Sequence, residues 1–240
     1  MSEPERVCVA RWLGRVGYEE AWALQRDLAV RRARSEITDT VLLLEHPPVY
    51  TTGRRACDDR LLVPEDALGA PLLAVDRGGD ITFHGPGQLI AYPIIGLGGQ
   101  PRGVQRYVRG LEETIIRTLA TYGIQAGREQ GLTGVWAGGE KIAAIGVRVS
   151  RPGGANGGWV TGHGLALNVS VDLAWFERIV PCGIAGRGVT SMERLLRRTE
   201  PLEAVAGRLA EEFGRVFGLR IVAPEGVLPP ARVGDTMGRG

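Results

Sequence analysis

Apolar residues recur along this chain with a helical period in three long stretches. The clearest is residues 104–122, where apolar side chains stand three or four positions apart at Val104, Tyr107, Val108, Leu111, Ile115, Leu119 and Tyr122. Gly123 follows, at the place where a helix commonly ends. Residues 18–34 and 202–217 also alternate apolar and charged positions, so we expect three amphipathic helices.

Short apolar runs between these helices predict strands. They span residues 7–12, 40–44, 72–75, 81–83, 89–95, 134–137, 141–149, 165–169 and 219–222. The runs at 72–75 and 81–83 flank Arg77–Asp80, so we expect a hairpin there. The runs at 134–137 and 141–149 are joined by a short turn that contains two glycines.

Strands and helices interleave without a linker or a repeat, which predicts one domain of the α/β (α+β) class. We assign residues 1–222 to this domain. Residues 223–240 contain three prolines and no apolar period, so we expect a flexible C-terminal tail.

Composition and charge exclude several classes of protein. With 44% apolar residues and a net charge of +2, the chain is expected to be globular and to bind no nucleic acid. No apolar run approaches the roughly 18 residues of a membrane helix, and the N-terminus lacks a signal-peptide pattern. Three scattered cysteines favour a reducing cytoplasm over a disulfide framework.

Common catalytic motifs are also absent. The chain has no CxxC or HExxH pattern and only three histidines, so no metal site is expected. It has neither a phosphate-binding P-loop nor a GxSxG elbow, which argues against a nucleotide hydrolase and a serine hydrolase.

Lys141 is a compositional anomaly, because every other basic residue among the 29 is arginine. It opens the apolar run KIAAIGV, so its stem is expected to be partly buried. An ordinary surface lysine is one interpretation. The alternative is a functional cation, since lysine can release its proton at a shifted pKa and arginine cannot.

Cys182 lies in the segment IVPCGIAGRGVTSM, between a proline and a glycine. A free cysteine is often a buried small hydrophobe. The flanking Pro181 and Gly183 instead predict a turn, where a thiol could react. Cys8 and Cys57 have no such context.

Three further segments combine polar side chains with glycine or proline. RGGDITFHGPGQ (Arg77–Gln88) could bring backbone close to a ligand or form a glycine-rich hairpin with His84 on the surface. EHPPVYTTGRR (Glu45–Arg55) is expected to be a rigid turn and a basic cluster, or a solvated loop. HGLALN (His163–Asn168) has a polar residue at each end of a strand-like run.

In this order, EHPPVYTTG, RGGDITFHGPGQ, GEKIAAIGVR, HGLALN and PCGIAGRGVTSM closely resemble segments of the octanoyl-[acyl-carrier-protein]:protein N-octanoyltransferase family. The match runs from Glu45 to Met192. The resemblance implies the fold of the biotin and lipoate ligase catalytic domains, with mixed sheets flanked by helices.

The resemblance also implies roles for individual residues. Cys182 would be the acyl-thioester nucleophile, and Lys141 would lower the pKa of its thiol. The acyl chain and its carbonyl would lie against three segments, whose members are Arg77, Gly78, Gly79, Asp80, Ile81, Thr82, Phe83 and His84, then Ala144, Ile145 and Gly146, then Gly164, Leu165 and Ala166. Residues 151–158 form a longer insertion than is usual in the family, expected as a hairpin tip beside the site.

The activity implied is acyl transfer in the lipoylation of proteins, by a cytoplasmic enzyme that needs no ATP, metal or other cofactor. Octanoyl-acyl carrier protein would be the donor. Lipoyl domains of 2-oxoacid dehydrogenases and the glycine cleavage H protein would be acceptors, and the enzyme would act as a monomer. Arg31, Arg32, Arg34, Arg54 and Arg55 suit an acidic carrier protein, or form an ordinary solvated surface.

The residues can be compared with three other functions. An ATP-dependent lipoate ligase of the same fold needs no thiol where Cys182 stands, so PCGI argues against it. A biotin ligase would carry a GRGRxGR-like loop, which this chain lacks. A non-catalytic module that binds acyl groups or lipoyl domains would require neither Cys182 nor Lys141.

Overall fold

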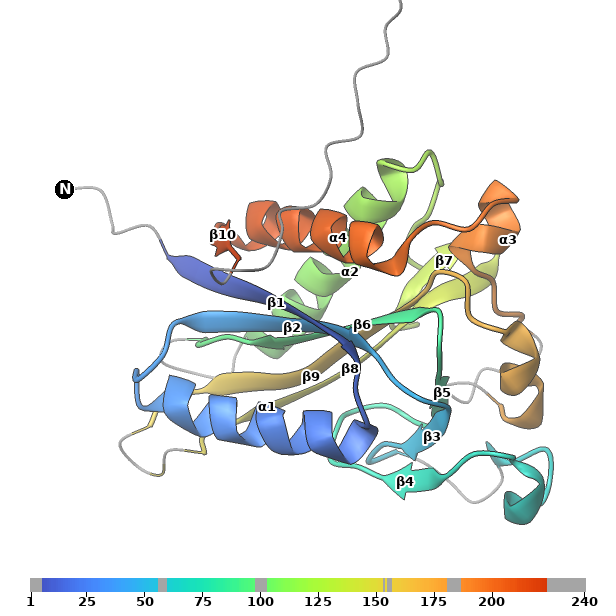
Figure 1. Cartoon of the computed structure of the whole chain (residues 1–240), viewed down its shortest axis with the longest axis horizontal. Coiled ribbons are helices and arrows are strands. Elements are labelled where there is room, and N and C mark those ends of the chain that lie inside the picture. Colours follow the sequence, from blue (N-terminus) through green and yellow to red (C-terminus); the bar gives the residue numbers. More distant parts are fainter. Residues whose placement is uncertain are drawn as a thin grey trace, which may run out of the picture.

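A seven-stranded mixed sheet forms the centre of the computed structural model, which describes residues 6–55, 60–97, 103–152, 154, 157–180 and 187–223. Its strands, in spatial order, are β10 (Arg220–Val222), β1 (Val7–Arg15), β2 (Asp39–Glu45), β6 (Gln88–Ile94), β9 (Val160–Asn168), β8 (Glu140–Ser150) and β7 (Val135–Ala137) (Figure 1). Strand β1 is parallel to both β10 and β2, and the remaining pairs are antiparallel.

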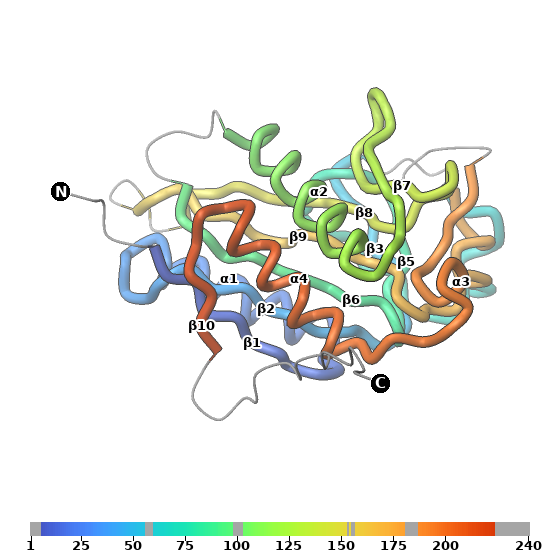
Figure 2. The backbone as a smooth tube through the Cα atoms, turned by 90° about the horizontal axis from the view of Figure 1, so that it is seen from above, coloured from blue at the N-terminus to red at the C-terminus, as the bar shows by residue number. Residues whose placement is uncertain are grey.

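Helices cover both faces of this sheet (Figures 1 and 2). Helices α2 (Val104–Ala120) and α4 (Leu202–Phe217) lie on one face, and α1 (Tyr18–Ala33) lies on the other. Strand β2 is buried on both faces, because its alternate residues point to opposite sides and helices cover both sides. Val41 and Leu43 pack in the core under α2 and α4, whereas Leu42 and Leu44 pack in the core under α1.

These elements confirm the helices expected from the sequence, to within two residues at each end. The chain also forms the short helix α3 (Met192–Leu196) and the 3-10 helices η2 (Glu65–Ala67) and η5 (Leu173–Arg178). None of the helices in the described ranges is long and apolar enough to cross a bilayer.

A second sheet, in the order β4-β3-β5, corrects one prediction. Its strands are β3 (Val49–Thr52), β4 (Leu72–Ala74) and β5 (Thr82–His84). The expected hairpin between β4 and β5 does not form, because β3 lies between them, parallel to β4 and antiparallel to β5. Strand β3 belongs to a segment expected to be a turn or solvated loop, but its Val49, Tyr50 and Thr51 are buried.

The glycine-rich insertion at residues 151–158 connects β8 to β9. Its described end follows the Ser150–Val160 pair, and Gly158 N–H donates to Ala33 O at the end of α1. Lys141 stands at the opposite end of β8. The insertion therefore lies at the end of β8 away from Lys141. Part of it lies outside the described residues, so the expectation of a hairpin tip beside the site stays a prediction. The predicted domain boundary falls at the last residue of β10, and the proposed tail beyond Ala223 lies outside the described residues.

We expect Leu111→Ala to lower the free energy of unfolding by about 2–5 kcal/mol, because Leu111 of α2 is fully buried against the sheet and the truncation leaves a cavity. Urea unfolding followed by circular dichroism measures the change. Arg106→Ala, at an exposed position of the same helix, serves as the control. Equal stabilities for the two variants would contradict this account of the core.

Candidate functional site

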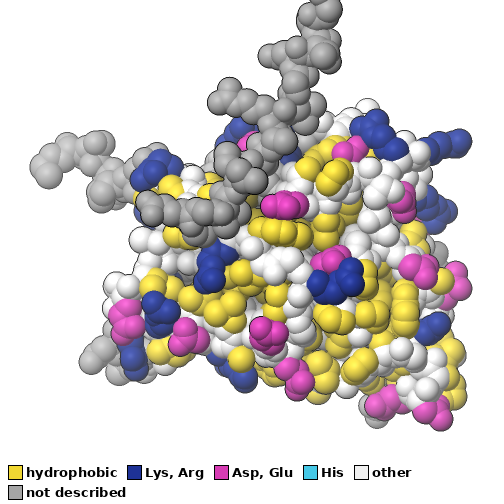
Figure 3. All heavy atoms as spheres, viewed as in Figure 1, with side chains coloured by type: hydrophobic (Ala, Val, Ile, Leu, Met, Phe, Trp, Pro, Cys, Tyr) yellow, Lys and Arg dark blue, Asp and Glu magenta, His cyan; other side chains and the backbone are white. Residues whose placement is uncertain are grey.

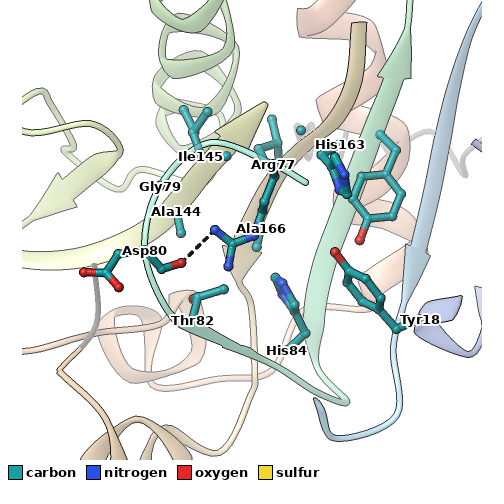
Figure 4. A pocket seen from close by; sticks show the side chains of 14 residues that line it. Tyr18, Arg77, Gly79, Asp80, Thr82, His84, Ala144, Ile145, His163 and Ala166 are labelled. Carbon is teal, nitrogen blue, oxygen red and sulfur yellow. Dashed lines mark hydrogen bonds between the residues drawn. The ribbon is translucent and has the colours of Figure 1, made fainter. Parts of the chain in front are cut away.

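A narrow slot that opens to solvent lies between the two sheets (Figure 4). Every residue predicted along the acyl chain lines it except Gly78, Ile81 and Phe83. Thr82 and His84 of β5 face the slot, whereas Ile81 and Phe83 point to the opposite side and pack with Tyr50. The structure thus brings together three sequence segments that are far apart in the chain.

The floor of the slot is made of very small residues. Ala144 and Gly146 of β8 pair with Ala166 and Gly164 of β9. A Cβ atom on Gly146 would lie 2.9 Å from Arg77 Cδ and 2.8 Å from the carbonyl oxygen of Gly78. Glycine is therefore required at this position, because Arg77 and the Gly78 carbonyl pack directly against the backbone of β8.

Arg77 forms part of the wall and holds the loop before β5 in place. The residue is buried, and its Nη2 donates to Thr51 O and Thr51 Oγ1, both at 2.8 Å. Its Nη1 donates to the carbonyl oxygens of Asp80 at 2.8 Å and Gly78 at 3.1 Å. The guanidinium thus ties β3 to the loop of residues 77–80. This contact stabilises the position of β3 between β4 and β5.

Three polar residues that the sequence did not single out as site residues also line the slot: Tyr18, Tyr92 and His163. The Nε2 of His163 lies 2.7 Å from Asp76 Oδ1, which assigns the ring proton to Nε2. Its Nδ1 is buried and has no hydrogen-bond partner among the described residues. Burial, followed by the positive charges of Arg77 and Arg148, lowers the pKa of His163 to about 3.

The other two histidines, His46 and His84, are buried as well. His84 Nδ1 lies 2.7 Å from Gln88 Oε1, and His46 Nε2 lies 2.8 Å from the Tyr92 hydroxyl. Burial lowers the pKa of His46 to about 4 and the pKa of His84 well below 6.5. The interpretation of His84 as a surface histidine is wrong.

Lys141 is only 5% exposed. A smaller adjoining cavity is lined by Lys141 and shares Thr82 and Ala144 with the slot. The Nζ atom lies 5.3 Å from the centre of the Trp136 ring, within the range of a cation–π contact. Burial of the residue contradicts the interpretation of Lys141 as an ordinary surface lysine.

Cys182 lies outside the described residues, but the chain on either side of it is described. Before it, Val180 N–H donates to Arg60 O, and the Arg60 side chain pairs with Asp80 of the slot at 2.9 Å. After it, Gly188 O accepts from Lys141 N–H at 2.9 Å, and Thr190 N–H donates to Lys141 O at 3.0 Å. Both flanking segments are therefore attached to residues of the site.

Among the described residues no cluster of three or more histidine, cysteine, aspartate or glutamate side chains could hold a metal ion. Cys8 is buried in β1, where burial raises the pKa of its thiol to about 12. A thiol with that pKa stays protonated near neutral pH, which makes Cys8 an unreactive part of the core.

The sequence profile of the lipoyl protein ligase A/B catalytic domain matches residues 17–214. An octanoyltransferase of Rubrobacter xylanophilus is 52% identical to this chain over 214 residues, covering 88% of this chain and 93% of the relative. An octanoyltransferase of Solibacter usitatus is 48% identical, with 90% and 96% covered. This chain belongs to the octanoyltransferase family.

Solved structures similar to this family member agree on the fold. The putative lipoate protein ligase Ta0514 of Thermoplasma acidophilum superimposes with a TM-score of 0.67 at 14% identity, covering 91% of this chain and 88% of the ligase. A lipoate-protein ligase A bound with ATP gives a TM-score of 0.67 at 15% identity, with 92% and 89% covered. The expected ligase-like α/β fold is confirmed.

We expect acid to destabilise the fold through the three buried histidines. Their pKa values are lowered in the folded state, so the unfolded chain takes up more protons as the pH falls below about 6.5. The contribution of the histidines to the free energy of unfolding is fully present above that pH. It declines toward pH 5 by about 1.4 kcal/mol per pH unit for each histidine.

Urea unfolding at pH 7, 6 and 5 measures this dependence. His163→Gln should reduce the slope by roughly one proton, since it removes one of the three titrating rings. An unchanged slope in this variant would show that His163 titrates alike in both states.

Proposed function

We propose that this chain transfers an octanoyl group from octanoyl-acyl carrier protein to a lysine of a lipoyl domain, through a thioester on Cys182. The observation that carries the proposal is the slot with a floor of glycine and alanine, which adjoins a smaller cavity lined by the single lysine of the chain. The identity to octanoyltransferases supports the same reaction.

In the first step, the Cys182 thiolate attacks the carbonyl carbon of the donor thioester. The pantetheine thiolate leaves and takes up a proton, and the octanoyl group stays on Cys182. In the second step, the neutral ε-amine of the acceptor lysine attacks the new thioester. An amide forms, the Cys182 thiolate leaves, and the amine loses one proton.

The slot would bind the alkyl part of the acyl group. Burying about seven carbons at ~0.8 kcal/mol each contributes roughly 5–6 kcal/mol to substrate binding. The predicted residues Gly146 and Gly164 line the slot together with Ala144 and Ala166, so the chain would lie against small residues of the sheet. Gly79 and Asp80 would form the opposite wall near the carbonyl end.

Lys141 would serve both steps. Its ammonium beside Cys182 would favour the thiolate by about 1.4 kcal/mol for each unit by which the thiol pKa falls. After acylation the thiolate charge is gone, so the ammonium loses its counter-charge and releases its proton more readily. The lysine can then accept the proton from the incoming amine, and an arginine could not.

An ATP-dependent ligase is the alternative within the same fold. The ligase structures share only 14–15% of residues with this chain, so they support the fold alone. Cys182 and the 52% identity to an octanoyltransferase favour the transferase.

The charges of the surface bear on where an acidic carrier protein could dock. Basic and acidic side chains are interspersed on the face in Figure 3. The three arginines of the cluster at the end of α1 pair with acids, namely Arg31 with Asp27, Arg32 with Asp39 and Arg34 with Glu36. This pairing favours the ordinary solvated surface for that cluster.

Arg55 lies elsewhere, on an open groove that adjoins the slot at Gly79 and Gly146. We place the donor protein on this side. The monomeric state and the cytoplasmic location expected from the sequence stay predictions.

Incubation with octanoyl-acyl carrier protein should add one octanoyl group to the protein, detected by intact mass spectrometry. Cys182→Ser should remove the adduct, whereas Cys8→Ser should keep it because Cys8 is a buried, protonated thiol. An adduct that persists in Cys182→Ser would refute the proposed nucleophile. Lipoyl-domain labelling that requires ATP and free acid would indicate the ligase.

Lys141→Arg should retain part of the acylation step and lose transfer to the lipoyl domain by at least about 100-fold, the usual size of a general-base contribution. Single-turnover mass spectrometry separates the two steps, and circular dichroism checks that the variant folds. Transfer at the rate of the unaltered chain would contradict the role of Lys141 as proton acceptor.

A further inference from the structure

Lys141 rests on the backbone of Gly134, the residue just before β7. A Cβ atom built on Gly134 would lie 2.7 Å from Lys141 Cε, 3.5 Å from Lys141 Nζ and 2.6 Å from the carbonyl oxygen of Ala143. Gly134 also has a φ of +123°, which side chains rarely permit. The end of the lysine side chain is thus in direct contact with a position that only glycine can occupy.

A buried carboxylate holds Gly134 in this position. Glu112 of α2 has no exposed side-chain surface, and its Oε1 accepts a hydrogen bond from Gly134 N–H at 3.2 Å. Its other oxygen, Oε2, lies 3.0 Å from Arg128 Nε and 2.7 Å from Arg109 Nη1. Glu112 therefore bonds both ends of the loop that runs from Arg128 to Gly134.

The loop is attached to the sheet just outside these ends, where Gly127 and Trp136 exchange backbone hydrogen bonds of 2.8 and 2.9 Å. Within the loop, Arg128 also pairs with Glu113, and Glu129 pairs with Arg187. Glu112 is the side chain that bonds Gly134 itself and so fixes where Gly134 lies under Lys141. Hydrogen bonds to a charged acceptor are among the stronger ones in proteins, and two bonded oxygens define an orientation as well as a distance.

We infer that Glu112 and Gly134 are positioning residues, which direct the Lys141 ammonium toward the reacting thiol. This inference rests on the proposed function, because it assumes that Lys141 acts on Cys182. It adds two residues that contact no substrate and belong to none of the segments that form the slot. The effect passes from the carboxylate to the glycine and from the glycine to the lysine.

Gly134→Ala tests the contact with the lysine directly. The methyl group would collide with Lys141 Cε and with a carbonyl oxygen that cannot move freely, so the lysine side chain must leave its position. Gly138→Ala is a matched control, since Gly138 has a φ of +59° in the turn before Lys141 but nothing within 4 Å of its Cβ position.

Glu112→Gln tests the carboxylate. An amide offers an oxygen on one side only, so it cannot accept from both Gly134 and the two arginines. The arginines should attract that oxygen, which leaves the amide NH₂ facing the Gly134 N–H. Glu113→Gln is the matched control, because Glu113 also pairs with Arg128, at 2.8 Å, and has no contact with Gly134.

The readout is the pH dependence of Cys182 alkylation by iodoacetamide, followed on the Cys182 peptide by mass spectrometry. We expect Gly134→Ala and Glu112→Gln to raise the midpoint by about one pH unit, which is a tenfold loss of thiolate near neutral pH. Gly138→Ala and Glu113→Gln should leave the midpoint unchanged. A melting temperature for each variant separates this effect from a loss of stability.

Lys141→Gln distinguishes the positioning role of Glu112 and Gly134 from the role of Lys141 itself. If it raises the midpoint while folded Gly134→Ala and Glu112→Gln do not, the positioning role is overturned and the role of Lys141 stands. If Lys141→Gln leaves the midpoint unchanged, Lys141 does not activate the thiol, and the proposed function fails at that step.

Discussion

The pairing of β8 with β9 is the constraint on which the site depends. Its register sets Ala144 beside Ala166 and Gly146 beside Gly164, so a strip of small residues lines the slot. Lys141 is the second residue of the same strand and lines the smaller cavity that adjoins the slot. A shift of one residue would turn every side chain to the other face and would put larger residues on the strip. A single ladder thus determines both the small residues of the slot and the position of Lys141.

Around this strip the chain buries an unusual set of polar groups, and each is held in one protonation state or one orientation. The three histidines are neutral because burial disfavours their charged forms, and Glu112 is paired with two arginines. Buried polar groups of this kind are costly unless they are bonded. Bonds such as those of His46 to Tyr92 and of His163 to Asp76 instead give the site a rigid outline, because they link elements that are distant in the sequence.

The sequence predicted the parts of this structure that depend on local pattern. The three long helices follow from the 3.6-residue period, and most strands follow from short apolar runs. Strand β3 was missed because it has only four residues, two of them threonine, and follows two prolines. Tyr18, Tyr92, His163 and Glu112 were not assigned to the site, since no spacing along the chain brings residues 18, 92, 112, 134 and 163 together. Only tertiary packing does so.

Arg77 gives the slot a property that matters when an acyl group enters. Its guanidinium hydrogen-bonds three backbone carbonyls and one hydroxyl, which closes the loop of residues 77–80 onto β3 before any ligand arrives. The wall is therefore ordered in advance, and association does not have to immobilise it. Binding of an alkyl chain should then show the heat-capacity decrease of buried apolar surface with little of the entropy loss that accompanies the folding of a loop around its ligand.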